Sequence, residues 1–446
     1  MRKYTLLYIC TFIWLCITAK PEFAHTSNTC PISDTTASTP PTYDTATVCT
    51  SAASDTLPLP FHQRIDSLLT DTLFQTSQIG IMVYDLTADT VVFAHNERQL
   101  MRPASTMKLT TAITALDYLG GSYRYTTLLL ANGEQHRNVL KGDVIIKGGM
   151  DPRFNHDDMN AFVEALQKAK IDTVCGNIFA DMSFKDTLML GSGWCWDDDN
   201  PVLTPLLWNR SDGFMPKFRQ RLQDANITIL PDTCHISDNQ PTRATSTASD
   251  TCPISDNHPA TPDTLVTRHH TLDQILVRMM KESDNLYAES MFYQIAAACQ
   301  HKGHSATASD AISVIKKLVQ KLGLNPADYR FADGSGLSLY NYQTPELQIR
   351  LLRYAYRNPN IYTHLYPALP IAAVDGTLKA RMQGTNAANN VHAKTGTVTG
   401  VSSLSGYLTA ANGNTLCFAI INQGITKSAL AKQFQDRLCD ILCTYK

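Results

Sequence analysis

The sequence predicts an α+β fold in which one domain of helices and strands carries a second, inserted α+β domain. Apolar residues recur at helical spacing from Leu109 to Leu116, and short β-like runs separated by turns follow from about Tyr123. Helices return after about residue 267, and three apolar runs near the C-terminus predict strands before a final helix. The change of pattern in the middle of the chain indicates the insertion.

The segment before the predicted folded part resembles an export signal followed by a tether. Two basic residues precede an almost wholly apolar run from Leu6 to Ile17. This pattern predicts a signal peptide over residues 1–19, cleaved after Ala19, with an uncleaved membrane anchor as the alternative. Residues 20–58 are rich in Ser, Thr, Pro and Asp and predict a disordered tether. We therefore expect an exported protein in the periplasm or cell-wall space, membrane-associated if the signal remains.

Composition shifts define the other predicted boundaries. Residues 59–122 form the first part of the outer domain, 123–231 the inserted domain, 232–267 a low-complexity surface loop and 268–446 the second part of the outer domain. Predicted strands cover 79–86, 90–94, 126–130, 143–147, 173–180, 391–394, 401–408 and 415–422. Predicted helices lie near 61–73, from 105, at 158–169, 272–281, 286–298 and 311–322, from 344, and at the C-terminus.

Charge and cysteine content exclude some classes of function. Lysine and arginine total 38 and aspartate and glutamate 40, so the net charge of −2 lacks the basic excess of a nucleic-acid-binding protein. No cysteine and histidine group has zinc-site spacing, and we expect neither a metal nor a cofactor. The twelve cysteines permit disulfides in an exported protein, but the sequence does not define their pairing.

A serine and a lysine three residues apart open the predicted helix at Ser105. The side chains of Ser105 and Lys108 would lie on one face, one turn apart. A lysine there can take the hydroxyl proton if burial or a neighbouring cation lowers its pKa. Alone, Ser105 would more often be a plain helix N-cap.

Two later motifs change the interpretation of Ser105. Ser-Asp-Asn at 283–285 lies between two predicted helices, and Lys-Thr-Gly-Thr at 394–397 follows a short predicted strand. Each alone would more often be a turn, a cap or a hairpin edge. In this order, with Ser-x-x-Lys first, they form the signature of penicillin-recognising serine acyltransferases. Lys108 and Lys394 would also depress each other's pKa if they were clustered.

With these motifs, the chain resembles the D-alanyl-D-alanine carboxypeptidase/endopeptidase family, the class C low-molecular-mass penicillin-binding proteins. Further matching text is Gly-Gly-Met-Asp-Pro at 148–152 and Asp-Gly-Ser-Gly-Leu-Ser at 333–338. The resemblance implies a transpeptidase/β-lactamase-like domain, with an antiparallel sheet between helix layers and a domain inserted between the first two motifs. The long stretch between residues 105 and 283 agrees, because the compact β-lactamase plan has no room for it.

The family implies a serine-type D-Ala-D-Ala carboxypeptidase that acts on peptidoglycan stem peptides through an acyl-serine and is inhibited by β-lactams. By resemblance, Ser105 is the nucleophile, Lys108 the general base, Ser283 and Asn285 act in proton transfer and substrate holding, and Lys394, Thr395 and Gly396 bind the substrate carboxylate region. Backbone N–H groups of Ser105 and Thr397 would form the oxyanion hole. Asp151 matches an inserted-domain aspartate that reaches the mouth of the site.

One departure and two alternatives accompany this interpretation. Leu339 stands where family members often carry a basic residue, which leaves recognition of the stem peptide's diamino acid open. A serine β-lactamase or esterase on the same scaffold is the first alternative, although no Glu-x-x-Leu-Asn element follows Ser283. A non-catalytic wall-binding protein is the second.

Overall fold

The computed structural model describes residues 59–230, 261–300 and 304–446. The predicted signal peptide and tether lie wholly outside these residues, and so does most of the predicted low-complexity loop. Within the described residues, every helix is too short or too polar to cross a membrane.

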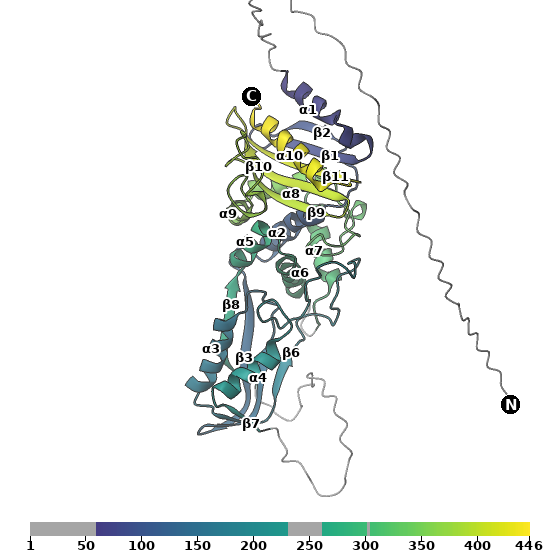
Figure 1. Cartoon of the computed structure of the whole chain (residues 1–446). Coiled ribbons are helices and arrows are strands. Elements are labelled where there is room, and N and C mark those ends of the chain that lie inside the picture. Colours follow the sequence, from purple (N-terminus) through teal and green to yellow (C-terminus); the bar gives the residue numbers. More distant parts are fainter. Residues whose placement is uncertain (1–58, 231–260, 301–303) are drawn as a thin grey trace, which may run out of the picture. The chain divides into compact units, whose positions relative to one another are not determined.

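The first sheet has five antiparallel strands in the order β2-β1-β11-β10-β9 (Figure 1). The strands are β1 (Gln78–Asp85), β2 (Thr90–His95), β9 (His392–Val398), β10 (Val401–Thr409) and β11 (Thr415–Gln423). The central strand, β11, is buried over most of its length, as the continuous apolar run at 415–422 predicted. Strand β9 forms one edge of this sheet, so part of its main chain has no neighbouring strand.

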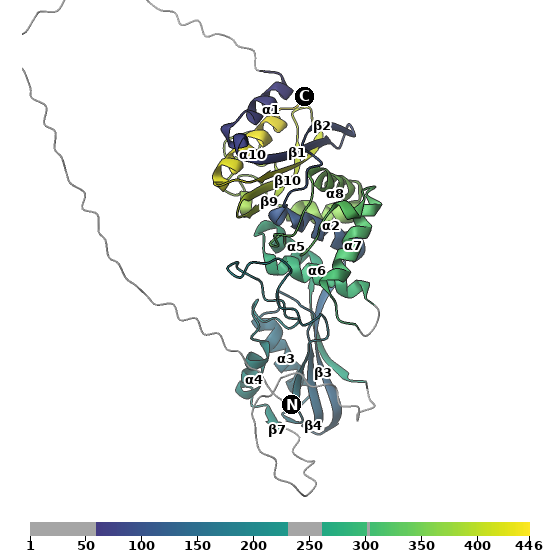
Figure 2. The ribbon, with the colours of Figure 1, turned by 90° about the vertical axis from the view of Figure 1, so that its right-hand side faces the viewer.

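Helices cover both faces of the first sheet (Figure 2). Helices α1 (Phe61–Leu69) and α10 (Ser428–Cys443) share a buried cluster with Ile81 and Val83. Met82 and Tyr84 point to the opposite face and pack with α2 (Met107–Tyr118) and α8 (Pro345–Arg357). The predicted antiparallel sheet between helix layers is therefore confirmed.

Helix α2 lies at the centre of the helical layer. It contacts α5 (Leu272–Lys281), α6 (Asn285–Cys299), α7 (Ala308–Lys321), α8 and α9 (Pro359–Ala368). Ten consecutive residues of α2, from Met107 to Leu116, are buried, although four of them are Lys or Thr. Buried polar side chains need hydrogen-bond partners, and Thr111 finds one in the carbonyl of Gly334, at 2.6 Å. This packing fixes the N-terminus of α2, which directly follows the turn that carries Ser105.

A second sheet forms the core of the inserted part of the chain (Figure 1). Its strands are β3 (Arg124–His136), β4 (Val139–Lys147), β5 (Thr173–Cys175), β6 (Ile178–Asp181), β7 (Thr228–Leu230) and β8 (Asp263–Thr271), in the order β7-β5-β4-β3-β8 with β6 also on β4. Helices α3 (His156–Lys168) and α4 (Phe214–Asp224) pack on it through Phe162 and Phe218. It has its own hydrophobic core, separate from the two clusters on the first sheet.

The predicted loop over 232–267 is wrong at its C-terminal end. Residues from Asp263 onward form β8, which pairs with β3 along its length. Most of this strand is polar and at least partly exposed, so it lacks the apolar alternation that would reveal a strand. The second sheet therefore extends to Thr271, which caps α5 directly.

Three other elements differ from the prediction. Helices α4 and α9 were not predicted, and the single strand expected at 173–180 is the separate pair β5 and β6. Gly176 lies between these two strands, and a Cβ there would stand 2.1 Å from the carbonyl oxygen of Gly142.

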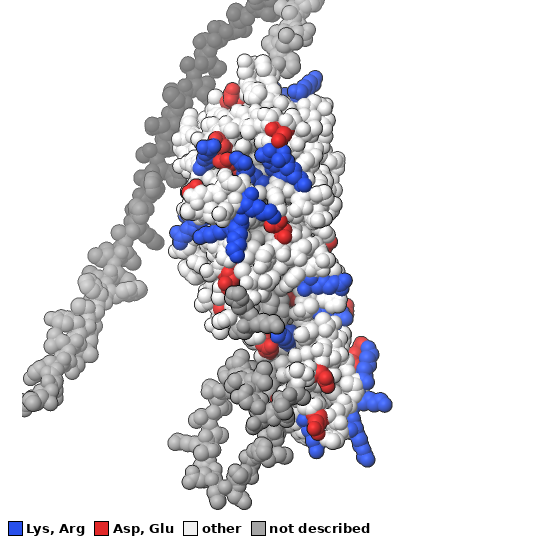
Figure 3. Space-filling model, turned by 180° about the vertical axis from the view of Figure 1, so that it is seen from behind, with Lys and Arg blue, Asp and Glu red and all other residues white. Residues whose placement is uncertain are grey.

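Charged side chains of both signs lie among one another on the face that Figure 3 shows. Ion pairs such as Arg381 with Asp436, at 2.6 Å, agree with this mixture. The exclusion of nucleic acid stays a prediction based on the charge balance.

Candidate active site

Ser105 lies in a 3-10 turn (Ala104–Thr106) that leads directly into α2. Ala104 has a φ of 47°, which is rare for a residue with a side chain and marks local strain. Gly336 packs against this turn with a φ of 83°, and a Cβ there would stand 1.9 Å from the Ala104 carbonyl oxygen. The prediction of a helical start near Ser105 is confirmed, and neighbouring backbone holds the turn in place.

Lys108 is completely buried, and its Nζ has three oxygen partners. These are Ser105 Oγ at 2.9 Å, Asn285 Oδ1 at 2.7 Å and the Ser335 carbonyl at 2.8 Å. Burial lowers the pKa of Lys108 to about 8, although three nearby carboxylates oppose the shift. Roughly a tenth of Lys108 is therefore neutral at pH 7, and the neutral fraction grows as the pH rises toward 8.

The partners of Lys108 suit a general base. The Ser335 carbonyl can only accept hydrogen bonds, and Asn285 presents its side-chain oxygen. A neutral lysine would use its two N–H groups on these acceptors. Its lone pair would then face Ser105 Oγ, which is the direction needed to remove the hydroxyl proton.

The Ser283–Asn285 turn lies between α5 and α6, as predicted. Ser283 has a φ of 60°, a second strained position in the site. Asp284 is buried, caps α6 and accepts hydrogen bonds from Arg210 and from Arg278 Nε, the latter at 2.9 Å. Burial acts to raise the pKa of Asp284, but the two arginines outweigh it and lower that pKa. The ionised Asp284 thus holds the turn that presents Ser283 and Asn285.

Lys394 lies on β9 and is also completely buried. Its Nζ donates to Ser283 Oγ at 2.8 Å and to the Thr395 carbonyl at 2.7 Å. Burial, with a contribution from Lys108, holds the pKa of Lys394 well below its usual range. The predicted mutual depression is thus found on Lys394, whereas burial is the cause that lowers the pKa of Lys108.

Gly396 brings β9 close to the nucleophile turn. A Cβ on Gly396 would lie 2.2 Å from Ser403 Oγ and 2.9 Å from Ser105 N. Thr395 donates from its hydroxyl to Thr377 Oγ1 at 2.7 Å, and Thr397 is exposed. The structure therefore brings all three predicted motifs together, although they are far apart in the sequence.

Sequence reasoning missed Glu289, which holds the loop that supplies one of the oxygen partners of Lys108. Buried Glu289 accepts hydrogen bonds from the backbone N–H of Gly334, at 3.1 Å, and of Ser335, at 2.8 Å. Burial raises the pKa of Glu289 to about 8, and buried Asp333 adds to the rise. Glu289 thereby fixes the loop whose Ser335 carbonyl binds Lys108. The available signal was an acidic residue inside the apolar helical run at 286–298.

Asp151 does not take the position that the sequence predicted. Its exposed fraction is 1%, so it does not stand open at the mouth of a site. One carboxylate oxygen lies 2.7 Å from His270 Nδ1, and the other accepts from the backbone N–H of Arg153 at 2.9 Å. None of its hydrogen bonds reaches the Ser105 cluster. We conclude that Asp151 joins β8 to the loop after β4 and has a structural role here.

The surroundings of Leu339 contain a basic side chain from elsewhere in the chain. Arg102 Nε donates to the Leu339 carbonyl at 3.1 Å, and the Leu339 N–H donates to the Gly193 carbonyl at 3.2 Å. Leu339 thus contributes its backbone to this region.

A family model and individual relatives both match this chain, and they agree on the family. Residues 61–206 and 244–445 match the model of the D-Ala-D-Ala carboxypeptidase 3 (S13) family. The chain is 26% identical over 452 residues to the D-alanyl-D-alanine carboxypeptidase DacB of Haemophilus influenzae, covering 84% of this chain and 93% of that one. It is 26% identical over 437 residues to a D-alanyl-D-alanine carboxypeptidase of Actinomadura sp., covering 81% and 80%.

Solved structures show the same fold. Penicillin binding protein 4 of Haemophilus influenzae superposes with a TM-score of 0.72 at 22% identity, covering 85% of this chain and 99% of that one. The same protein in complex with a β-lactam gives a TM-score of 0.67 at 22% identity, covering 86% and 100%. The predicted fold class is confirmed by these likenesses.

Proposed function

The chain belongs to the D-Ala-D-Ala carboxypeptidase 3 (S13) family and is a serine DD-peptidase that acts on peptidoglycan, and we propose that Ser105 is its nucleophile and Lys108 the general base. The observation that carries this proposal is the 2.9 Å contact between Lys108 Nζ and Ser105 Oγ. Burial of Lys108 and its two other acceptors support a neutral amine aimed at the hydroxyl.

Acylation begins when Lys108 takes the Ser105 proton and Oγ attacks the carbonyl carbon of the scissile amide. The Oγ–C bond forms, and the carbonyl oxygen becomes an oxyanion. Backbone N–H groups of Ser105 and Thr397 stabilise this charge. Strand β9 comes close to Ser105 N at Gly396. This supports the proposal that N–H groups from β9 and from the Ser105 turn bind the same oxyanion.

Collapse of the intermediate breaks the C–N bond and releases the C-terminal D-Ala. Ser283, whose hydroxyl binds Lys394, donates its proton to the leaving amine and regains one as the proton that Lys108 took from Ser105 passes on to it, which leaves Lys108 neutral again. Asn285 gives its oxygen to Lys108, which leaves its amide nitrogen to donate to a substrate carbonyl. Lys394, Thr395 and Gly396 form the region that receives the substrate carboxylate. The edge position of β9 allows an extended peptide to pair with its main chain.

Water then attacks the acyl carbon, with the neutral Lys108 taking its proton as base. The C–Oγ bond breaks, Ser105 Oγ takes that proton from Lys108, and the shortened peptide leaves. A β-lactam forms the same Oγ–C bond when its ring amide opens, so it blocks Ser105. The sequence predicts that neither a metal nor a cofactor takes part, and the proposed cycle uses only groups of the chain, the substrate and water. Undiminished activity in excess chelator would test the prediction for metals.

Release of D-Ala from a peptide that mimics the stem peptide tests this function. We expect D-Ala release, together with a stable penicillin adduct on a peptide containing Ser105, identified by mass spectrometry. Rapid penicillin hydrolysis without D-Ala release would favour the β-lactamase or esterase alternative. A protein that neither releases D-Ala nor forms the adduct would favour the wall-binding alternative. Mass spectrometry of digested muropeptides would then separate carboxypeptidase from endopeptidase products.

Export of the protein is a further part of the proposal. The basic and apolar pattern before Ala19 supports it, and peptidoglycan lies outside the cytoplasm. Mass spectrometry of the mature protein should find an N-terminus at Lys20. A chain that retains its first residues in the membrane fraction would support the anchor alternative.

A further inference from the structure

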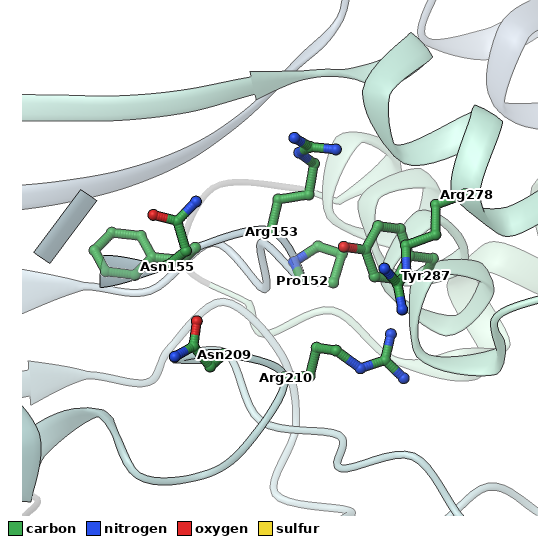
Figure 4. A pocket seen from close by; sticks show the side chains of 8 residues that line it. Pro152, Arg153, Asn155, Asn209, Arg210, Arg278 and Tyr287 are labelled. Atoms are coloured by element: carbon green, nitrogen blue, oxygen red, sulfur yellow. The ribbon is translucent and has the colours of Figure 1, made fainter. Parts of the chain in front are cut away.

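A hollow with a basic lining lies where the inserted part of the chain meets α5 and α6. Its volume is about 280 Å³ (Figure 4). The loops after β4 and before α4 contribute one wall, and α5 and α6 contribute the other. None of its described lining residues is acidic, and none belongs to the three motifs of the candidate active site. Its polar lining consists of Arg153, Asn155, Asn209, Arg210, Arg278 and Tyr287, and we call it the arginine pocket.

Positive charge exceeds negative charge around the arginine pocket. Arg210 and Arg278 share one carboxylate, that of buried Asp284. Arg278 also lies 3.5 Å from Glu282, whose side chain is 63% exposed and therefore well screened by water. Arg153 makes no ion pair with any described residue. Three guanidinium groups thus face one buried carboxylate, which leaves an excess of about two positive charges.

Arg153 gives a second and independent indication of an anion site. Its Nε is buried and has no hydrogen-bond partner among the described residues. Its backbone N–H donates to Asp151 at 2.9 Å, so the unsatisfied group belongs to the side chain alone. A buried guanidinium nitrogen without an acceptor costs free energy, because it has lost its hydration without gaining another hydrogen bond. An anion in the pocket would supply that acceptor.

Tyr287 lies among the three guanidinium groups. The Cζ atoms of Arg278 and Arg210 lie 5.1 Å and 5.7 Å from the centre of its ring. Figure 4 shows Arg153 and Arg210 on opposite sides of Tyr287 and Pro152. Burial raises the pKa of Tyr287, and the positive charges of all three arginines oppose that rise. The three charges therefore act on one side chain and surround one small space.

We propose that the arginine pocket binds a phosphate group, either free inorganic phosphate or a phosphomonoester. A phosphomonoester carries about −1.5 to −2 charges at pH 7 and three acceptor oxygens, which matches the excess positive charge of the pocket. Guanidinium groups bind phosphate oxygens through paired hydrogen bonds, and three of them line the pocket. A carboxylate has one charge and two oxygens, so it would leave some of these donors without an acceptor. This inference goes beyond the proposed function and does not rest on it.

Arg153 is the informative residue to change. Arg210 and Arg278 also hold Asp284, and their loss would disturb the turn before α6. The side chain of Arg153 holds no carboxylate within the described residues, and its backbone bond to Asp151 does not depend on the side chain. Arg153→Gln should therefore weaken phosphate binding without disturbing the fold, which circular dichroism would check.

Calorimetric titration of the full chain with inorganic phosphate tests the pocket. We expect Arg153→Gln to raise the Kd roughly 10-fold, the effect of losing one charge-assisted hydrogen bond. Arg437→Gln, at an exposed arginine paired with Asp71, should keep the native Kd. Phosphate should also raise the Tm of the native protein more than that of Arg153→Gln, because a ligand that binds the folded state stabilises it.

Glycerol 3-phosphate distinguishes the two sources of the phosphate group. A lower Kd for it than for inorganic phosphate would assign the pocket to a phosphomonoester, and an equal or higher Kd would assign it to free phosphate. Succinate tests the class of ligand. A Kd for succinate as low as that for phosphate would overturn the assignment to phosphate.

Protein acylated with benzylpenicillin separates the arginine pocket from the candidate active site. It should keep the native Kd for phosphate, because no lining residue of the pocket belongs to the three motifs. Loss of phosphate binding on acylation would place the anion at Ser105 and overturn the proposal. A native protein that binds no phosphate, or an unchanged Kd in Arg153→Gln, would also overturn it. If benzylpenicillin forms no adduct, the proposed function has failed, and the comparison of native protein with Arg153→Gln still tests the pocket.

Discussion

The candidate active site contains two serine–lysine pairs whose lysines are buried and whose serines are partly exposed, and the pairs differ in their surroundings. Lys108 and Lys394 are both fully buried, and their Nζ atoms lie 2.9 Å and 2.8 Å from Ser105 Oγ and Ser283 Oγ. Three carboxylates, those of Asp333, Glu289 and Asp284, oppose the loss of charge on Lys108. The causes that act on Lys394 are burial and the positive charge of Lys108, and both lower its pKa.

This difference separates the two roles. A general base works best with a pKa near the working pH, and the carboxylates keep the pKa of Lys108 at about 8. Lys394 keeps less affinity for a proton until an anion arrives, and a substrate carboxylate would restore it. Burial thus lowers the pKa of both lysines. The carboxylates near Lys108 limit this fall, which makes Lys108 the lysine suited to act as the base.

The largest expected effect distinguishes the two serines. Ser105→Ala should lower acylation by a labelled penicillin roughly 10⁴-fold or more, because no other hydroxyl replaces the nucleophile. Ser283→Ala should lower D-Ala release roughly 100-fold, as expected for loss of a proton donor, yet still allow labelling. Circular dichroism should show native folding of both variants. Covalent labelling of Ser105→Ala at the native rate would place the nucleophile elsewhere.

The second prediction concerns the base. Lys108→Met should lower acylation roughly 1000-fold, within the range for loss of a general base. In the native protein, kcat/KM should rise with pH below about 8 and level off above it, because only the neutral amine accepts the Ser105 proton. Stopped-flow acylation across this range would test the sign. A rate that falls as the pH rises through 8 would exclude neutral Lys108 as the base.

The sequence predicted the residues of the candidate site better than the contacts that hold those residues in place. Ser105, Lys108 and Lys394 lie in short motifs with fixed spacing, so the sequence alone was enough to propose roles for them and to predict that they share one site. Ser335 binds Lys108 through its main-chain carbonyl, which a residue of any type would supply, so the sequence does not reveal this contact. Asp151 matched a motif, but its pairing with His270 depends on β8, whose polar sequence concealed the strand. Contacts between distant segments are the part that periodicity and spacing do not contain.

The third prediction tests the backbone that holds the nucleophile turn. Gly336→Ala combines a φ of 83° with a Cβ only 1.9 Å from the Ala104 carbonyl oxygen. We expect a loss of about 3 kcal/mol in the free energy of unfolding, from left-handed strain and overpacking together. Gly384→Ala is the matched control, with a φ of 70° and nothing within 4 Å, and should lose about 1 kcal/mol. Equal urea midpoints for the two variants would contradict the importance of the contact.

The smallest effect is expected beneath Lys108, at Glu289. Glu289→Gln keeps the shape but presents one acceptor oxygen to the N–H groups of Gly334 and Ser335. Loss of about one hydrogen bond predicts acylation lowered roughly 3- to 10-fold. The midpoint of the pH profile should also move below the native value, because Glu289, whose own pKa is about 8, is partly ionised there and its charged form raises the pKa of Lys108. A merely structural role would lower the rate and leave that midpoint in place. As a control, Glu346→Gln, whose side chain pairs with the exposed Arg98 at 3.3 Å and not with the Lys108 cluster, should change neither.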